Sequence, residues 1–250
     1  MRKTEYKYLG TIFTNKYNTQ FKIIEYINYN NVTVLDMTHN IILKNIMMKD
    51  IKLNYIISPL DKSVFDVGYY GIGEYTRDNH SKCYQSWYNM MFRCYSDKYR
   101  QLFPTYKDIY VCDEWKNYQN FAKWFYSNYY EINNERMELD KDILIKHNKI
   151  YAPNTCCFLP RRINSLLINS KAIRGKFPIG VDYNNNKYRA RCNTLNGSVH
   201  LGYFTTVEKA FIAYKNFKEQ YIKDVANEYK EYIPKNVYDA LMKYTIEMND

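Results

Sequence analysis

Hydrophobic and polar residues alternate most regularly in residues 180–204, which read GVDYNNNKYRARCNTLNGSVHLGYF. The alternation and its two polar interruptions predict three short strands joined by tight turns. In the second predicted strand, residues 187–191, cations alternate with Tyr188 and Ala190, so the cations share one face of the sheet. We therefore expect a small sheet that exposes positive charge on one side and packs its other side against a helix.

A helical period follows this predicted sheet. Thr205 or Thr206 can cap the N-terminus of a long helix, and Glu208 is favourable in its first turn. A final helix is expected to start after Pro234 and to continue to about Ile246. The apolar stripe of the long helix comprises Val207, Ala210, Phe211, Tyr214, Phe217 and Tyr221. This stripe predicts the face of the helix that covers the sheet.

The N-terminal part of the chain has the pattern of strands. Two alternating segments, 21–27 and 32–37, are separated by Asn-Tyr-Asn-Asn, which is a turn signal. A further strand is expected at 41–43, and a glycine-containing segment, 68–73, completes the unit. We interpret residues 1–78 as a small β domain, with a five-stranded barrel of the SH3 type as its expected form.

The middle of the chain changes to a helical period. Residues 84–95 place apolar side chains on one stripe, and Asp113 can cap a second helix over 114–126. A short strand at 137–140 and a last helix at 160–167 follow. The first stripe comprises Trp87, Met90, Met91 and Cys94. The predicted fold class is therefore α+β, with domains at residues 1–78, 79–170 and 171–250.

Positive charge is concentrated in one part of the chain. The formal net charge is +10, and residues 160–204 contain eight Lys or Arg residues and a single acid, Asp182. Such a concentration is typical of proteins that bind a polyanion, and Arg161 and Arg162 are candidate DNA contacts within it. A solvated basic face without a nucleic-acid partner is the alternative interpretation.

The N-terminus does not have the pattern of a secretory signal, and no apolar run is long enough to span a membrane. We therefore expect a cytoplasmic protein whose six cysteines stay reduced. Cys94, Cys112 and Cys156, or its neighbour Cys157, could hold a structural zinc ion. Since no C-x-x-C pair is present, buried thiols without metal are the alternative.

Residues 180–217, with the preceding isoleucine, contain the pattern I-G-V … Y-R-A-R … H-L-G-Y-F-T-T-x-E-x-A-F-x-A-Y. This pattern resembles the APETALA-type, ethylene-response-factor-like DNA-binding domain, in the short version found in bacteriophage and homing-endonuclease proteins. The resemblance implies that the sheet lies in the major groove of double-stranded DNA. It also implies that Gly180 and Gly202 are backbone positions without room for a side chain. The implied DNA contacts are Lys187, Arg189 and Arg191, with Asn184, Asn186 and His200 in addition.

Four groups of residues in the middle of the chain form a second pattern. They are W-x-x-M-x-x-R-C-Y from Trp87, V-C-D-E-W from Val111, F-x-x-W from Phe121, and a core that starts with L-D-K-D at Leu139 and continues through N-K-I-Y-A-P-N-T-C-C-F to I-N at Ile163. The pattern resembles phage-encoded HNH endonucleases of the intron-homing type. This resemblance implies a strand–loop–strand–helix unit that holds one divalent metal ion, Mg²⁺ or Mn²⁺, against the scissile phosphate.

The same resemblance implies individual site residues. Asp140 falls where an acidic metal ligand is expected, and Asn154 falls near the second ligand position. Lys141 stands where the family has its general-base histidine, and a lysine needs a strongly lowered pKa for that role. Asn164 matches the asparagine of the last helix, and His147 replaces the missing histidine only if its loop folds inward. The implied catalytic set is Asp140, Lys141, His147 and Asn164.

Two functions follow from these resemblances. The first is a metal-dependent HNH endonuclease that is directed to DNA by its C-terminal sheet and acts in the cytoplasm of an infected bacterial host. The alternative is a catalytically decayed HNH fold that binds DNA, or that binds a host protein in counter-defence. The replacement of the expected histidine by Lys141 favours the alternative, so the enzymatic assignment stays open at this stage.

Overall fold

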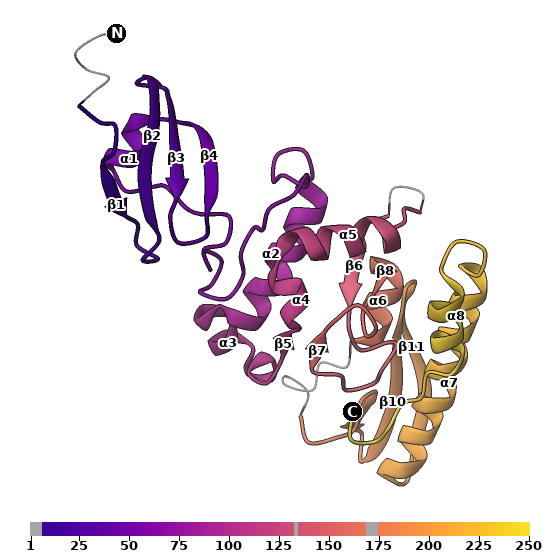
Figure 1. Ribbon diagram of the computed structural model, residues 1–250. Coiled ribbons are helices and arrows are strands. Elements are labelled where there is room, and N and C mark those ends of the chain that lie inside the picture. The colour runs from indigo at the N-terminus through magenta and orange to yellow at the C-terminus, as the bar shows by residue number, and fades with distance from the viewer. Residues whose placement is uncertain (1–6, 133–134, 169–174) are drawn as a thin grey trace. The chain divides into compact units, whose positions relative to one another are not determined.

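The computed structural model describes residues 7–132, 135–168 and 175–250 (Figure 1). The chain forms two compact units, Met1–Tyr126 and Ser127–Asp250. Within the described residues it contains eight α-helices and eleven strands, which confirms the predicted α+β class. The three predicted domain boundaries stay a prediction, and each unit is described separately below.

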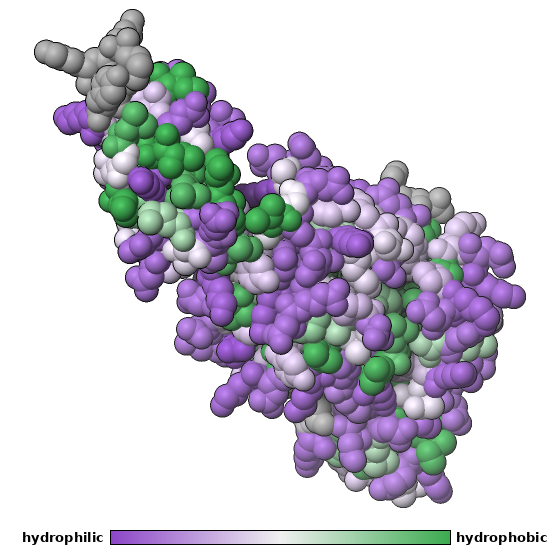
Figure 2. Space-filling model, in the orientation of Figure 1, coloured by the Kyte–Doolittle hydropathy of each residue, from purple (hydrophilic) through white to green (hydrophobic). Residues whose placement is uncertain are grey.

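An antiparallel sheet of four strands opens the N-terminal unit, with the strands paired in chain order. The strands are β1 (Ile12–Thr14), β2 (Gln20–Asn28), β3 (Asn31–Asp36) and β4 (Ile41–Ile46). Alternation in β2 buries Phe21 and Ile23, which pack with residues of β3 and of helix α1 (Met48–Lys52). The opposite face carries exposed apolar residues, and Figure 2 shows hydrophobic surface gathered over this sheet.

The glycine-containing segment 68–73 does not add a fifth strand to this sheet, so the expected five-stranded barrel is wrong. The segment forms two isolated bridges, one from Gly68 to Val64 and one from Tyr69 to Asn117. A Cβ at Gly68 would lie 2.8 Å from the Met91 side chain. Gly68 therefore allows the backbone to lie close to the helix that carries Met91, and it does not extend the sheet.

Helices form the rest of the N-terminal unit. They are α2 (Ser81–Tyr95), α3 (Asp97–Leu102), the 3₁₀ turn η1 (Pro104–Tyr106), α4 (Asp113–Lys116) and α5 (Tyr118–Asn128), with the short strand β5 (Tyr110–Val111) before α4. The predicted stripe of α2 is confirmed, because all four of its members are buried. Trp87 of α2 also donates its indole N–H to the carbonyl of Trp115 at 2.7 Å.

The helix predicted over 114–126 is divided at Asn117, whose extended backbone ends α4. The Asn117 side-chain oxygen accepts the N–H of Gln119 at 2.9 Å, a local bond that competes with the helix. Cys112, not Asp113, occupies the N-cap of α4. The prediction for Asp113 is therefore wrong. Its carboxylate instead pairs with Lys116 at 2.6 Å within the first turn.

The C-terminal unit begins with a strand–loop–strand–helix segment. It consists of β6 (Met137–Asp140), β7 (Ile150–Tyr151), β8 (Cys157–Pro160) and α6 (Arg161–Leu167). Strands β6 and β8 pair antiparallel, with Asp140 opposite Cys157. Both the strand at 137–140 and the helix that ends at Leu167 agree with the predicted positions.

A three-stranded antiparallel sheet and two helices follow (Figure 1). They are β9 (Val181–Asn184), β10 (Lys187–Thr194), β11 (Gly197–Phe204), α7 (Val207–Glu228) and α8 (Lys235–Met242). Thr206 caps α7 and accepts the N–H of Lys209. Ala190 and Cys192 of β10 are buried against Phe211 and Tyr214 of α7. The predicted two-faced sheet packed on a helix is therefore confirmed.

Helix α7 also forms the second core of this unit. Its C-terminal half contributes Ile222, Val225 and Ala226, which pack with Leu159 of β8 and Ile163 of α6. Val237 and Leu241 of α8 close this core. The three-stranded sheet and the strand–loop–strand–helix segment thus pack on one helix, which holds both in a common unit.

Candidate nucleic-acid interface

The exposed face of the three-stranded sheet is built around β10. Arg189 lies between Asp182 of β9 and Tyr203 of β11 in the strand register. Arg191 lies opposite His200 of β11, and Lys187 lies opposite Asn184 of β9. Because side chains alternate across a strand, these positions place three cations in a row on one surface.

Asp182 binds both arginines of this row. Arg189 donates from Nε and Nη2 to the two carboxylate oxygens, each at 2.9 Å, and the Nε of Arg191 lies 3.1 Å from Oδ2. The hydrogen bonds from Arg189 lower the pKa of Asp182, although burial opposes the change. The carboxylate therefore stays charged and fixes the direction of both guanidinium groups.

Two features of β11 shape the same face. The register shifts by one residue between Ala190 and Arg191, which is a bulge in the pairing with β11. Gly202 beside it has φ +126°, a conformation that residues with a side chain rarely adopt. The rings of His200 and Tyr203 lie 4.9 Å apart and both residues are exposed. Tyr203 was absent from the predicted contacts, because strict alternation from His200 places it on the opposite face and only the bulge brings the two residues to one side.

The predicted contacts Asn184 and Asn186 lie at the β9–β10 turn. Asn184 ends β9 and is half-buried, whereas Asn186 is exposed with φ +57°. Asn185 shares this left-handed conformation at φ +49°. Asparagine tolerates such backbone angles, so Asn185 and Asn186 have a conformational role in the turn, and the contacts of Asn184 and Asn186 with DNA stay a prediction.

The Asp140 carboxylate ends β6 and organises the loop that follows. Its Oδ1 accepts the N–H groups of Asp142 and Ile143 at 2.9 and 2.8 Å. Within the described residues, no hydrogen bond reaches its Oδ2. Burial raises the pKa of Asp140, and the charge of Asp142 adds to this effect. A cation placed at Oδ2 would favour the ionised carboxylate.

Lys141, the candidate general base, is buried and fully engaged by its neighbours. Its Nζ donates to both carboxylate oxygens of Asp142 at 2.7 and 2.8 Å, and to the carbonyl of Asn148 at 2.7 Å. An ammonium group has three donors and no acceptor, so these contacts use its hydrogen-bonding capacity. In this geometry Lys141 is a cation that stabilises the loop through Asp142 and Asn148. These contacts do not support its assignment as a general base.

The other implied site residues differ in their exposure and in their partners. His147 is exposed with φ +61°, and its Nε2 lies 3.6 Å from Asp250. Asn154 is exposed in the turn before β8. Asn164 of α6 donates to Glu138 Oε2 at 2.7 Å. Glu138, two residues before Asp140 on β6, is therefore a carboxylate of this region that the sequence analysis did not identify.

The implied zinc ligands are distributed over both units. Cys94 and Cys112 belong to the N-terminal unit, and Cys156 belongs to the C-terminal unit. Burial raises the pKa of Cys156 to about 12, and burial also raises the pKa of Cys112. Among the described residues no three His, Cys, Asp or Glu side chains form a group suited to a metal ion. A structural zinc ion stays a prediction.

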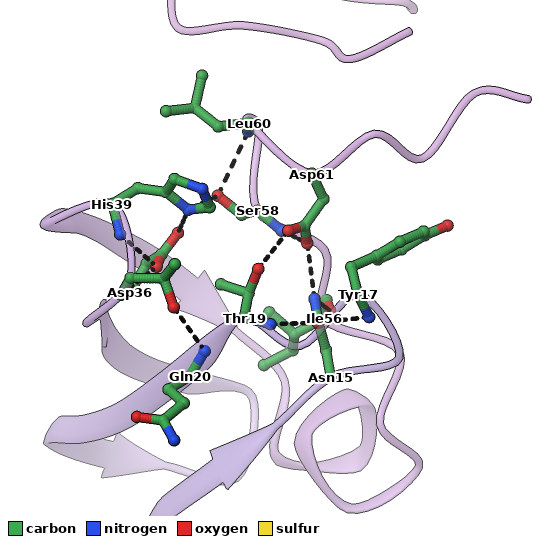
Figure 3. A network of polar contacts seen from close by, with 11 residues as sticks. Asn15, Tyr17, Thr19, Gln20, Asp36, His39, Ile56, Ser58, Leu60 and Asp61 are labelled. Carbon is green, nitrogen blue, oxygen red and sulfur yellow. Dashed lines mark hydrogen bonds and ion pairs between the residues drawn. The ribbon is translucent and has the colours of Figure 1, made fainter. Parts of the chain in front are cut away.

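The N-terminal unit contains a buried polar network that superficially resembles a catalytic triad (Figure 3). Asp36 Oδ2 lies 2.8 Å from His39 Nδ1, and Ser58 Oγ lies 3.4 Å from the same nitrogen. In a Ser-His-Asp triad the serine and the aspartate contact opposite ring nitrogens. Ser58 is also fully buried. The network therefore has a structural role.

Comparison with models of protein families, with curated proteins and with solved structures found no match. None of the helices in the described part of the chain is both long and apolar enough to cross a lipid bilayer.

Proposed function

We propose that this protein binds double-stranded DNA through the exposed face of its three-stranded sheet. The observation that carries the proposal is the row of Lys187, Arg189 and Arg191 on β10, whose opposite face is buried against α7. A narrow two- or three-stranded sheet fits the major groove, where arginine can bind guanine edges and phosphates. Asp182 holds two of the cations in fixed directions, which lowers the entropy lost on binding.

The test is a titration of a labelled duplex of about 20 base pairs with the full-length protein at several salt concentrations. We expect Arg189→Gln with Arg191→Gln to weaken binding and to lower the salt slope by about 2, since each phosphate contact contributes about 0.9. The control is Lys235→Gln with Lys243→Gln, which removes the same charge from α8 and its C-terminal end. Equal slopes for the two double variants would count against the sheet as the DNA-binding surface.

We propose metal-dependent phosphodiester cleavage as a second candidate function. It is supported by Asp140 at the end of β6, whose Oδ1 accepts two backbone N–H groups and whose Oδ2 accepts no hydrogen bond within the described residues. Asp140 and Asn154 would hold Mg²⁺ or Mn²⁺, which would stabilise charge on the scissile phosphate. Lys141 would keep the loop in place, since its ammonium is bound to Asp142.

Two variants of Asp140 separate cleavage from folding. Asp140→Asn keeps an oxygen for the N–H groups of Asp142 and Ile143 but removes the charge that binds a metal ion, whereas Asp140→Ala removes both. We expect neither variant to nick plasmid DNA with Mg²⁺ or Mn²⁺, and only Asp140→Ala to lose stability. Nicking by Asp140→Asn at the rate of the unmodified protein would contradict the role of Asp140 as a metal ligand.

A further inference from the structure

A pocket of about 320 Å³ in the C-terminal unit is separate from the sheet face described above. Its wall combines the segment before β6, helix α6 and the turn that follows β10. The residues that line it are Glu135, Arg136, Arg161, Arg162, Ser165 and Leu195. Three arginines outweigh one glutamate, so the pocket is positively charged. A volume of this size accommodates a phosphate group with its attached sugar.

Two of the arginines have donors available for a ligand. The Nε atoms of Arg136 and Arg161 lie 3.6 and 4.0 Å from Glu138 Oε1, and both side chains are two-thirds exposed. Within the described residues these long ion pairs are the polar contacts of the two guanidinium groups. Each guanidinium has five N–H donors, so Glu138 orients the groups without using most of them.

The third arginine, Arg162, is positioned by a hydrogen bond to Tyr229. Arg162 Nη1 donates to the Tyr229 hydroxyl at 3.2 Å, and that hydroxyl donates to Glu135 Oε1 at 2.6 Å. Burial raises the pKa of Tyr229, and the bond to Glu135 adds to this effect, so the hydroxyl keeps its proton. One oxygen of the single carboxylate in the wall, Glu135 Oε1, is therefore bound to a tyrosine, and its Oε2 is buried without a hydrogen-bond partner among the described residues.

We propose that this pocket binds a backbone phosphate of DNA, with Arg136 and Arg161 as its ligands and Arg162 as a third cation positioned by Tyr229. The planar guanidinium group matches the oxygens of a phosphate in pairs, which favours phosphate over a monovalent halide. Leu195 of the pocket directly follows β10, the strand that carries Arg189 and Arg191. The inference rests on the proposed DNA binding and adds a second point of contact, on the strand–loop–strand–helix segment.

The first experiment measures duplex binding by the full-length protein with Arg136→Gln and Arg161→Gln together. We expect the salt slope to fall by about 2, since two cation–phosphate contacts are removed. The charge-matched control is again Lys235→Gln with Lys243→Gln, at positions that do not line the pocket. A slope and an affinity equal to those of the control would overturn the pocket as a DNA contact.

The second experiment uses inorganic phosphate as the probe and follows the arginine Nε–H signals by NMR. We expect the signals of Arg136 and Arg161 to move with phosphate and to stay in place with equal concentrations of chloride. Such movement in a protein that binds no duplex would show a site for free phosphate, and would refute both the proposed function and the pocket as a DNA contact. Duplex binding that depends on Arg189 and Arg191 but not on Arg136 and Arg161, with unmoved signals, would refute the pocket alone.

Discussion

Arg189 and Asp182 face each other across β10 and β9 and form a two-point ion pair, with both hydrogen bonds at 2.9 Å. The pair lies on the surface that we propose for DNA, and neither side chain is fully buried. Its carboxylate is shared with Arg191. The acidic residue in the middle of a basic face is therefore part of the structure that orients the cations.

We expect Asp182→Asn to lower the free energy of unfolding by about 1 kcal/mol at neutral pH, in the range of well-oriented surface pairs. Hydrogen bonds from Arg189 lower the pKa of Asp182. The stabilisation is therefore fully present above the ordinary pKa of the carboxyl group and is lost as the pH falls through the lowered value. Urea denaturation followed by circular dichroism should show a difference between variant and unmodified protein that disappears in acid. A constant difference across this range would contradict the assignment.

Gly180 allows the start of the sheet to contact α7. Its φ is +77°, and a Cβ there would lie 2.0 Å from the ring of Tyr214. We expect Gly180→Ala to cost about 3 kcal/mol or more, because overpacking adds to backbone strain. Gly197→Ala is the matched control, since Gly197 also has positive φ but a Cβ there would have no neighbour within 4 Å. Equal losses in thermal denaturation would show that the contact with Tyr214 is not the cause.

Asp36 is the buried anion of the N-terminal sheet. Burial raises its pKa, but hydrogen bonds from Ser58 and His39 outweigh that effect and the net pKa is lowered. We expect Asp36→Asn to destabilise the unit by about 1–3 kcal/mol at neutral pH, since an amide leaves buried donors and acceptors mismatched. The loss should shrink as the pH falls through the lowered pKa of Asp36, because the unmodified protein then loses the same charge.

The measurement for Asp36 is hydrogen exchange of the backbone N–H groups of β2 and β3. Asp78→Asn serves as the control, because Asp78 is an exposed carboxylate in the same unit. The interpretation of the network as structural would be wrong if Asp36→Asn left this exchange as slow as the control does.

Local patterns in the sequence predicted those parts of the fold that depend on neighbours along the chain. Alternation placed Ala190 inside and Arg191 outside, and the two candidate caps Thr205 and Thr206 placed the start of α7 to within one residue. The obstruction that the resemblance implied at Gly180 agrees with the position of the Tyr214 ring, whereas a Cβ at Gly202 would meet Phe204 at an ordinary 3.5 Å. In each case the deciding interaction is a strand period, a cap or a backbone angle.

The features that the sequence did not show depend on partners that periodicity does not specify. Lys141 is bound by a carbonyl seven residues away, so its type and position alone could not show that its ammonium is engaged. Asn117 divides a helix through one side-chain bond, although the apolar period continues across it. The role of Glu138 as a hydrogen-bond partner of Asn164 depends on the pairing of β6 with β8, which the sequence does not specify.

Lys218 is a further residue that the predicted apolar stripe of α7 did not include, and it is 7% exposed. Its Nζ has one long hydrogen bond, 3.4 Å to the carbonyl of Asn193. Burial lowers its pKa, and the neighbouring Cys192 opposes that effect. A buried ammonium with a single weak partner costs stability, because the loss of hydration is not compensated.

We expect Lys218→Met to raise the free energy of unfolding by about 1 kcal/mol or more at neutral pH. The pKa of Lys218 is lower in the folded state, so the folded state binds fewer protons than the unfolded state between the lowered pKa and 10.5. The unmodified protein therefore gains stability as the pH rises through this window. The advantage of the variant should therefore shrink toward alkaline pH.

Lys215→Met on the same helix is the control and should destabilise, since Lys215 donates to the Ile246 carbonyl at 2.6 Å. The measurement is the free energy of unfolding from chemical denaturation at neutral and alkaline pH. A Lys218→Met variant that is less stable than the unmodified protein at neutral pH would mean that the bond to Asn193 outweighs the cost of burial.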